Sequence, residues 1–114
     1  MNTDDETKTI NRCRIVGVLD DGEASLSRAA LAHLQAAQLV IGGTRTLALF
    51  AAQIAPEALQ RDLTGALSLV PGWIREAQAD GLRVVVLATG DPLCHGIAAY
   101  LASRLCIEAI EVLP

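Results

Sequence analysis

Aromatic residues are scarce in this sequence of 114 residues: Phe50, Trp73 and Tyr100 are the single copies of their types. Apolar residues nevertheless make up 52% of the chain, and most of them are Ala, Leu, Val and Ile. We therefore predict a core that packs almost entirely through aliphatic side chains. The length suits one domain that buries roughly two thirds of the surface exposed by its unfolded chain.

Long hydrophobic runs are also missing. No apolar stretch approaches the roughly 18 to 20 residues that cross a bilayer, and the polar start, MNTDDETKTINR, has no segment like that of a signal peptide. We expect a soluble, cytoplasmic protein with no membrane partner. Residues 1–12 show no periodic apolar pattern, so we expect them to form a disordered polar tail.

Cysteine pairs and excess positive charge are absent as well. Cys13, Cys94 and Cys106 form no C-x-x-C motif and no set with histidine at the spacing of metal ligands, so we expect reduced thiols and no metal site. Nine Lys and Arg stand against thirteen Asp and Glu, which gives a formal charge of -4. Without a basic run, we expect no nucleic-acid partner.

Two common nucleotide-binding motifs do not occur. A dinucleotide fold would carry G-x-G-x-x-G after its first strand, but here Gly17 is next followed by a glycine at Gly22. The P-loop is absent because there is no Gly-Lys-Ser/Thr. No Ser/His or Cys/His pair is identifiable by spacing, and we expect His33, on the apolar side of a helix, to be a packing residue. The catalytic residues therefore stay unassigned.

Predicted strands and helices alternate along the chain. This alternation favours an α/β fold in three layers, with a mainly parallel sheet and helices on both of its faces. Residues 58–63 could be an edge strand or a loop. Because the last strand runs to the terminus, we expect the chain to be part of a longer protein. The expected strands are 13–19, 39–41, 83–88 and 107–113, and the expected helices are 26–37 with Ser25 as cap, 45–54 with Thr44 as cap, 65–81 with a possible fresh start at Pro71, and 95–105.

The stretch TGDP, residues 89–92, follows the clearest predicted strand. Ligands of open α/β sheets bind beyond the carboxyl ends of strands, where Gly90 would bare the backbone and Asp91 could meet ribose hydroxyls or an ammonium group. The same residues also describe an ordinary helix start, with Asp91 as N-cap and Pro92 as first helical residue. The two interpretations are compatible, and spacing alone leaves both open.

Two further side chains are expected near this edge of the sheet. Arg45 follows Gly42 and Gly43 after the second predicted strand, where a cation could meet an anionic ligand or simply be solvated. His95 directly follows the TGDP loop and could face the same ligand. We do not expect Cys94 and His95 to form a metal pair, because adjacent positions at a helix start point in different directions.

Three segments together resemble a known family. RIVGVLDDG, AAQLVIGGTRTLALF and VVVLATGDPLCHGIAAYLASRL occur in the order and spacing of the N-terminal domain of the tetrapyrrole methylases. The similarity covers residues 13–114 and is greatest to the precorrin-6Y C5,15-methyltransferase branch. It implies S-adenosylmethionine-dependent C-methylation of a corrin precursor in cobalamin biosynthesis, with the cofactor between two α/β domains. It also implies a homodimer, since members of the superfamily are often dimers.

The resemblance carries expectations about individual residues. With such a substrate, we hypothesise that Arg45 meets one of its carboxylates, because of its place after Gly42 and Gly43, and that His95 faces the same cleft. The chain departs from the family where a turn such as G-x-G-P-G is usual, because it has GVLDDGE there, and the family's C-terminal half is absent. We therefore expect half a site and an inactive isolated chain. The cofactor contacts that the resemblance implies are Gly17, Thr89, Gly90, Asp91, Pro92 and Cys94.

Two other functions remain open at this point. One is a methylase of the same superfamily that acts on ribosomal RNA or on a translation factor, although the lack of basic runs and the presence of GGTR argue against it. The other is a non-catalytic α/β module that uses its sheet as an interaction surface. The broken first loop would be tolerated in such a module.

Overall fold

The computed structural model describes residues 13–18, 26–89, 97, 99–101, 103, 104 and 110–113, with the backbone alone described at residues 89 and 110–113. Among the helices of these residues, none is both long enough and apolar enough to cross a membrane.

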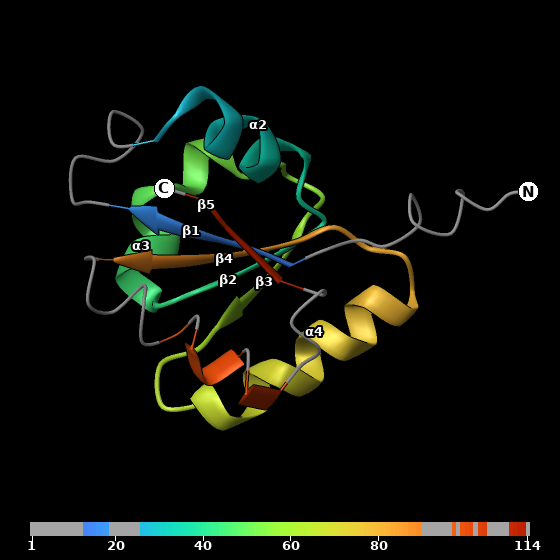
Figure 1. Cartoon of the computed structure of the whole chain (residues 1–114). Coiled ribbons are helices and arrows are strands. Elements are labelled where there is room, and N and C mark those ends of the chain that lie inside the picture. Colours follow the sequence, from blue (N-terminus) through green and yellow to red (C-terminus); the bar gives the residue numbers. More distant parts are fainter. Residues whose placement is uncertain are drawn as a thin grey trace, which may run out of the picture.

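Five strands form one sheet in which every pairing is parallel. Their order across the sheet is β3-β2-β4-β1-β5, so β4 is central and β3 and β5 are edges (Figure 1). This arrangement confirms the α/β class and the parallel sheet, and it shows that residues within 58–63 form an edge strand. The strands are β1 (Cys13–Val18), β2 (Leu39–Gly42), β3 (Leu59–Asp62), β4 (Val84–Thr89) and β5 (Ile110–Leu113).

Helices cover both faces of the sheet, as the sequence predicts. Helix α2 and the segment around α3 pack on one face, and α4 packs on the other together with helical residues between 97 and 104 (Figure 1). The helices are α2 (Arg28–Ala36), α3 (Thr44–Leu49) and α4 (Val70–Ala79), with 3-10 turns η2 (Ala51–Gln53) and η3 (Leu67–Leu69).

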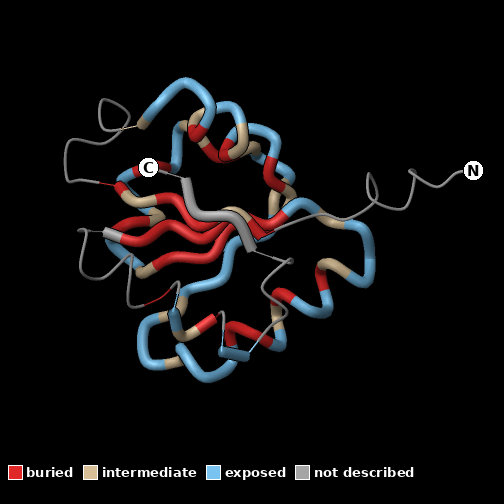
Figure 2. The backbone as a smooth tube through the Cα atoms, in the orientation of Figure 1, coloured by how far each residue is buried: buried red, intermediate tan, exposed pale blue. Residues whose placement is uncertain are grey.

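The central strand β4 explains why the core is aliphatic. Residues 84–88 of this strand are all buried, because a central parallel strand is covered on both faces (Figure 2). Val84, Val86 and Ala88 contribute to the cluster that includes α4, whereas Val85 and Leu87 contribute to the cluster that includes α2. The alternation of strand side chains thus divides one apolar run between two cores.

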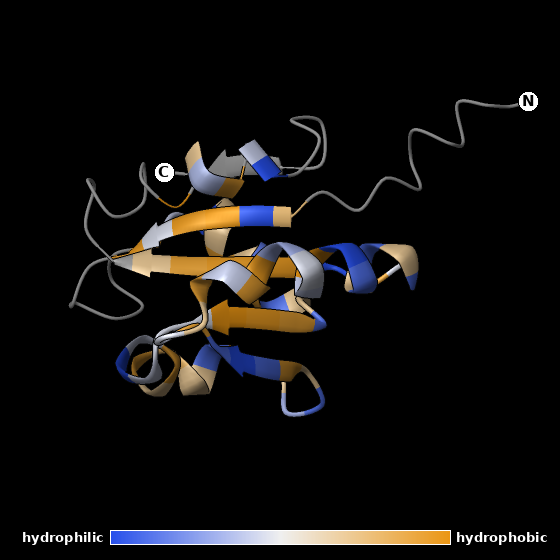
Figure 3. Cartoon of the chain, turned by 90° about the horizontal axis from the view of Figure 1, so that it is seen from below, coloured by the Kyte–Doolittle hydropathy of each residue, from blue (hydrophilic) through white to orange (hydrophobic). Residues whose placement is uncertain are grey.

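The edge strand β3 has the opposite character. All four of its residues are exposed, and three of them are polar or charged, which Figure 3 shows as a hydrophilic strand beside the hydrophobic β2. Charged side chains on an edge strand discourage pairing with other chains. This composition explains why sequence patterning alone could not separate a strand from a loop here.

Two predicted helix caps are wrong. The N-cap of α2 is Ser27, whose hydroxyl accepts a hydrogen bond of 3.1 Å from the backbone N–H of Ala30, so the helix begins two residues later than a cap at Ser25 implies. The N-cap of α3 is Gly43, and Thr44 is the first helical residue. Thr44 does not cap the helix because its hydroxyl bonds Asp62 instead.

Helix α3 is also shorter than predicted. The chain leaves the α-helical path after Leu49 and forms η2, which brings Phe50 and Ile54 into the core beside α2. Helix α4 begins at Val70, one residue before the suggested start at Pro71. Proline is tolerated there because first-turn N–H groups have no helical partner. Ala30 and Leu34 of α2 and its C-cap Ala37 are buried, whereas Ala29 is exposed.

Candidate functional site

The carboxyl ends of the strands form one edge of the molecule, on the side of the arrowheads in Figure 1. The last residue of β1 is in register with the last residue of β4, Val18 with Thr89, and the last residue of β2 is in register with that of β3, Gly42 with Asp62. The carboxyl ends of four adjacent strands therefore lie side by side at this edge.

The connections that leave β2 and β4 diverge. The chain leaves β2 toward the outer strand β3 through α3 on the α2 face, and it leaves β4 in the other direction toward β5 past the helical residues 97–104 on the α4 face. Because β2 and β4 are neighbours, this is a topological switch point, the place where open α/β sheets bind ligands. Gly42 and Gly43 lie on one side of it and Thr89 on the other.

Small residues lie at or next to the ends of three adjacent strands. Gly17 and Ala88 are register partners one residue before the ends of β1 and β4, and β2 ends in Gly42. A Cβ built at Gly42 would lie 3.5 Å from side-chain atoms of Leu47 and Leu87, an ordinary contact distance, so glycine is not required there by packing. Gly17 is half-buried, whereas Gly42 and Ala88 are buried.

A carboxylate fixes the loops that follow β2 and β3. Asp62 accepts a hydrogen bond from the hydroxyl of Thr44 and another, at 2.9 Å, from the backbone N–H of Thr64. The Thr44 hydroxyl is the larger cause, and the Thr64 N–H the next, of a pKa for Asp62 below its usual 3.8. The backbone N–H of Leu63 also bonds the carbonyl of Gly42 at 3.0 Å. The start of α3 is thus tied to the end of β3.

Several residues predicted for the site lie within the described part of the chain. Gly17 lies within β1 rather than in a loop, and it is half-buried. Thr89 ends β4. Arg45 is the second residue of α3 and is exposed next to the Gly42–Gly43 turn. His33, expected to be a packing residue, is half-buried in the last turn of α2.

The remaining predicted site residues lie outside the described residues. They are Gly90, Asp91, Pro92, Cys94 and His95. Within the described part of the chain, no group of three or more His, Cys, Asp or Glu residues is placed to hold a metal ion.

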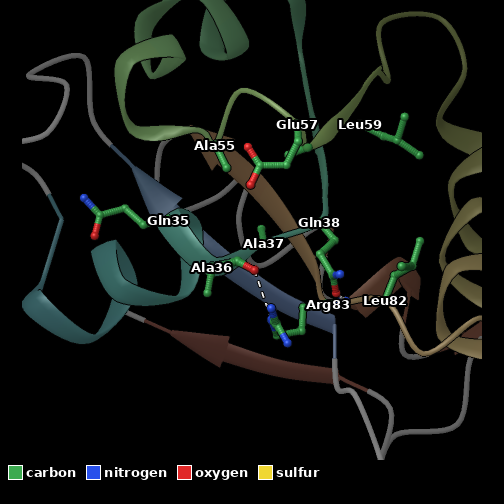
Figure 4. A pocket seen from close by; sticks show the side chains of 10 residues that line it. Gln35, Ala36, Ala37, Gln38, Ala55, Glu57, Leu59, Leu82 and Arg83 are labelled. Carbon is green, nitrogen blue, oxygen red and sulfur yellow. Dashed lines mark hydrogen bonds between the residues drawn. The ribbon is translucent and has the colours of Figure 1, made fainter.

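A cavity of about 400 Å³ lies at the other edge of the sheet, near the amino ends of β2 and β4 (Figure 4). The backbone N–H of Arg83 donates to the side-chain carbonyl of Gln38 at 3.0 Å, and the carbonyl of Arg83 accepts from the N–H groups of Gln38 and Leu39. The Arg83 Nε also donates to the carbonyl of Ala36 at the end of α2. These contacts brace the entrance to two strands, which is a structural role.

The sequence did not point to this cavity. Its polar side chains are those of Gln35 in α2 and of Gln38, Glu57 and Arg83, which come shortly before β2, β3 and β4. These residues are distant in the sequence, and the parallel sheet brings them together. A cation near the carboxyl end of a helix is favourable. The position of the Arg83 side chain at the end of α2 is therefore explained without a bound ligand.

Comparison with protein families gives a match over nearly the whole chain. Residues 12–114 match the family model described as Tetrapyrrole (Corrin/Porphyrin) Methylases. A cobalt-precorrin-7 C(5)-methyltransferase of Salmonella typhimurium is 35% identical over 101 residues, which cover 88% of this chain and 47% of that protein. A decarboxylating precorrin-6Y C(5,15)-methyltransferase of Sinorhizobium sp is 37% identical over 101 residues, covering 88% of this chain and 23% of that protein.

Solved structures have the same fold. A cobalt precorrin-4 methyltransferase superposes with a TM-score of 0.71 at 22% identity, over 89% of this chain and 45% of that one. The methyltransferase CobJ superposes with a TM-score of 0.64 at 26% identity, over 90% of this chain and 44% of that one. The chain thus spans about half the length, or less, of the proteins that it matches.

Proposed function

Because the chain belongs to the tetrapyrrole (corrin/porphyrin) methylases, we propose that residues 13–114 form the N-terminal domain of an S-adenosylmethionine-dependent C-methyltransferase. Its substrate would be a corrin precursor of the precorrin-6Y type, in cobalamin biosynthesis in the cytoplasm. The single observation that carries this proposal is the identity of 35% and 37%, over 88% of the chain, to two methyltransferases named for precorrin substrates.

The residues at the carboxyl edge fit the cofactor. Gly42 ends β2, and Gly17 and Ala88 stand one residue before the ends of β1 and β4, so few bulky side chains would stand between an adenosine and these strand ends. Gly90 and Asp91 follow Thr89 directly in the sequence, and the carboxylate of Asp91 would bind ribose hydroxyls or the ammonium group. Pro92 and Cys94 would complete the cofactor contacts of this half.

S-adenosylmethionine, when bound, supplies a methyl group on a positively charged sulfur. The work of the chain is then to hold donor and acceptor in line, because alignment alone can contribute up to about 7 to 11 kcal/mol. A site from which water is excluded would also favour a reaction that disperses charge. A nucleophilic side chain is unnecessary, consistent with a sequence that offers no evident one.

Arg45 and His95 would face the substrate in this proposal. A corrin precursor carries many carboxylates, whereas the chain has a formal charge of -4, so cations at the binding edge have to offset the repulsion. Arg45 is exposed beside the Gly42–Gly43 turn and is placed to meet one carboxylate.

The test is cofactor binding, followed in the chain labelled with 15N and titrated with S-adenosylhomocysteine to millimolar concentration. We expect weak binding by this half alone, with chemical-shift changes at Gly17, Gly42 and Thr89 and no changes at Arg83 on the opposite edge. Asp91→Ala should abolish the changes. Changes at Arg83 instead, or an unaltered response in Asp91→Ala, would argue against the proposal.

Activity requires the second half. A chimera that joins residues 1–114 to the C-terminal half of the Salmonella typhimurium relative should methylate a corrin precursor and bind S-adenosylhomocysteine in the micromolar range. In this chimera, Asp91→Ala should raise the dissociation constant for S-adenosylhomocysteine by at least tenfold. A folded chimera that neither binds the cofactor nor turns over would contradict the proposed function.

A further inference from the structure

A second hollow lies between α4 and the helical residues 97–104, on the sheet face opposite α2. Its volume is about 420 Å³, and it involves the first turns of α4, which begins near the carboxyl edge because it follows β3 (Figure 1). The lining residues are Ser68, Leu69, Pro71, Gly72, Arg75, Tyr100 and Arg104.

The charge of this hollow differs from that of the chain. Two arginines and no acidic residue line it, although the whole chain has a formal charge of -4. Among the described residues, neither Arg75 nor Arg104 forms an ion pair with a carboxylate. An anion bound in the hollow would be attracted by both guanidinium groups, since both arginines line it.

Both guanidinium groups are held in place by the protein. Arg75 donates a hydrogen bond from Nη2 to the backbone carbonyl of Arg104, and the guanidinium of Arg104 stacks over the ring of Tyr100 at 5.1 Å from its centroid. Each guanidinium has five N–H donors, so most donors remain for a ligand. Groups that are already ordered lose less conformational entropy when they bind.

The rim of the hollow is apolar. Leu69 lines the hollow and is 56% exposed, and the half-buried Tyr100 also contributes to the lining. A fitting ligand therefore combines a carboxylate, for the two arginines, with an apolar body that covers Leu69.

We propose that this hollow binds a carboxylate carried on an apolar ring system and, if the proposed function holds, a carboxylate side chain of the tetrapyrrole substrate. It would be a contact additional to the switch point of the sheet. It offsets the repulsion between an acidic chain and a polycarboxylate ligand by concentrating two cations where the ligand's apolar ring can also be covered.

The test uses the 114-residue chain and uroporphyrin, an aromatic tetrapyrrole with eight carboxylates, with binding followed by the change in porphyrin absorption. We expect Arg75→Gln/Arg104→Gln to raise the dissociation constant at least tenfold. The matched control is Arg28→Gln/Arg61→Gln, which removes the same charge from exposed positions outside the hollow. It should change the dissociation constant less than threefold.

Leu69→Glu provides a second variant that leaves the fold alone, because the side chain is exposed. The new carboxylate would compete with the ligand for the two guanidinium groups. The dissociation constant for uroporphyrin should therefore rise at least tenfold. Equal losses in both double arginine variants, an unaffected Leu69→Glu, or no uroporphyrin binding by the unaltered chain would overturn the inference.

The same variants separate this inference from the proposed function. Arg75→Gln/Arg104→Gln should leave the response to S-adenosylhomocysteine at Gly17 and Thr89 unchanged. Cofactor binding without uroporphyrin binding would refute only the proposal that the hollow binds a carboxylate. Uroporphyrin binding at the hollow without any cofactor response would leave a carboxylate site and refute the methyltransferase proposal.

Discussion

The side chains of Thr44 and Asp62 join two loops that leave neighbouring strands at the carboxyl edge of the sheet. Thr44 opens α3 just after β2, and Asp62 ends β3, so one hydrogen bond sets the position of the Gly42–Gly43 turn relative to the edge strand. The second bond to Asp62, from the N–H of Thr64, turns the chain away from β3. The turn that presents Arg45 is therefore fixed by a residue outside its own helix.

Asp62 should make stability depend on pH in the acid range. Because the Thr44 hydroxyl and the Thr64 N–H lower its pKa below 3.8 in the folded chain, the folded state is favoured by this group above pH 3.8. That contribution is lost as the pH falls through the lower, folded-state value. We expect the melting temperature of Asp62→Asn to lie below that of the unaltered chain at pH 6, and the difference to vanish near pH 2.

Thermal unfolding monitored by circular dichroism between pH 2 and pH 6 measures this difference. Glu57→Gln is the matched control, because this exposed carboxylate has no hydrogen-bonded partner among the described residues. If the difference in melting temperature between Asp62→Asn and the unaltered chain is the same at pH 2 as at pH 6, the charge on Asp62 is not its cause.

The cap of α2 gives a prediction about stability. Ser27→Ala removes the acceptor for the Ala30 N–H and should lower the free energy of unfolding by about 1 kcal/mol. Ser25→Ala should leave it within about 0.5 kcal/mol, because the helix begins at Arg28 and Ser27 is already its cap. Urea unfolding of both variants distinguishes the two serines, and a larger loss in Ser25→Ala would contradict the assignment.

The sequence predicted the elements that local patterning decides. β4 was clear because a strand buried on both faces reads as a nearly continuous apolar run, and residues 84–88 supply one. The caps were missed because two serines stand near the start of α2, and spacing does not tell which hydroxyl meets an N–H. Thr44 was misassigned since its partner, Asp62, lies 18 residues away in the sequence.

The site was predictable only in part for the same reason. Arg45 could be placed at the carboxyl edge because two glycines, Gly42 and Gly43, mark the end of the strand before it. The hollow beside α4 could not be predicted, because Arg75 and Arg104 are 29 residues apart in the sequence. They come together only when α4 packs beside the later helical residues. Long-range proximity of this kind leaves no local pattern.

Cys13 should be inert in the folded chain. Burial raises the pKa of its thiol from 9.0 to about 12, with a smaller opposing effect from Arg14. The thiolate fraction at pH 8 is therefore about a thousandfold lower than for an exposed thiol. In a Cys94→Ser/Cys106→Ser variant, Ellman's reagent should not modify the native chain over an hour, and it should react within minutes after unfolding in guanidinium. Rapid modification without denaturant would contradict the burial of Cys13 in β1.

Arg45 gives the prediction that bears most directly on substrate binding. In the chimera with the C-terminal half of the Salmonella typhimurium relative, Arg45→Ala should raise the KM for the corrin precursor about three- to tenfold, the range of one partly solvated charge-assisted contact. The dissociation constant for S-adenosylhomocysteine should not change, because the proposed cofactor contacts come from Gly17 and residues 89–94. Arg45→Lys should recover part of the loss, since it keeps the charge but not the planar fork.

Arg28→Ala is the control for a general loss of positive charge, because Arg28 is equally exposed but begins α2 rather than α3. It should leave the KM for the corrin precursor within twofold. If Arg45→Ala also leaves that KM unchanged, Arg45 does not meet a substrate carboxylate. The carboxylates of the substrate would then have to bind other cations. A rise of the same KM in Arg75→Gln/Arg104→Gln would indicate that they bind in the hollow beside α4.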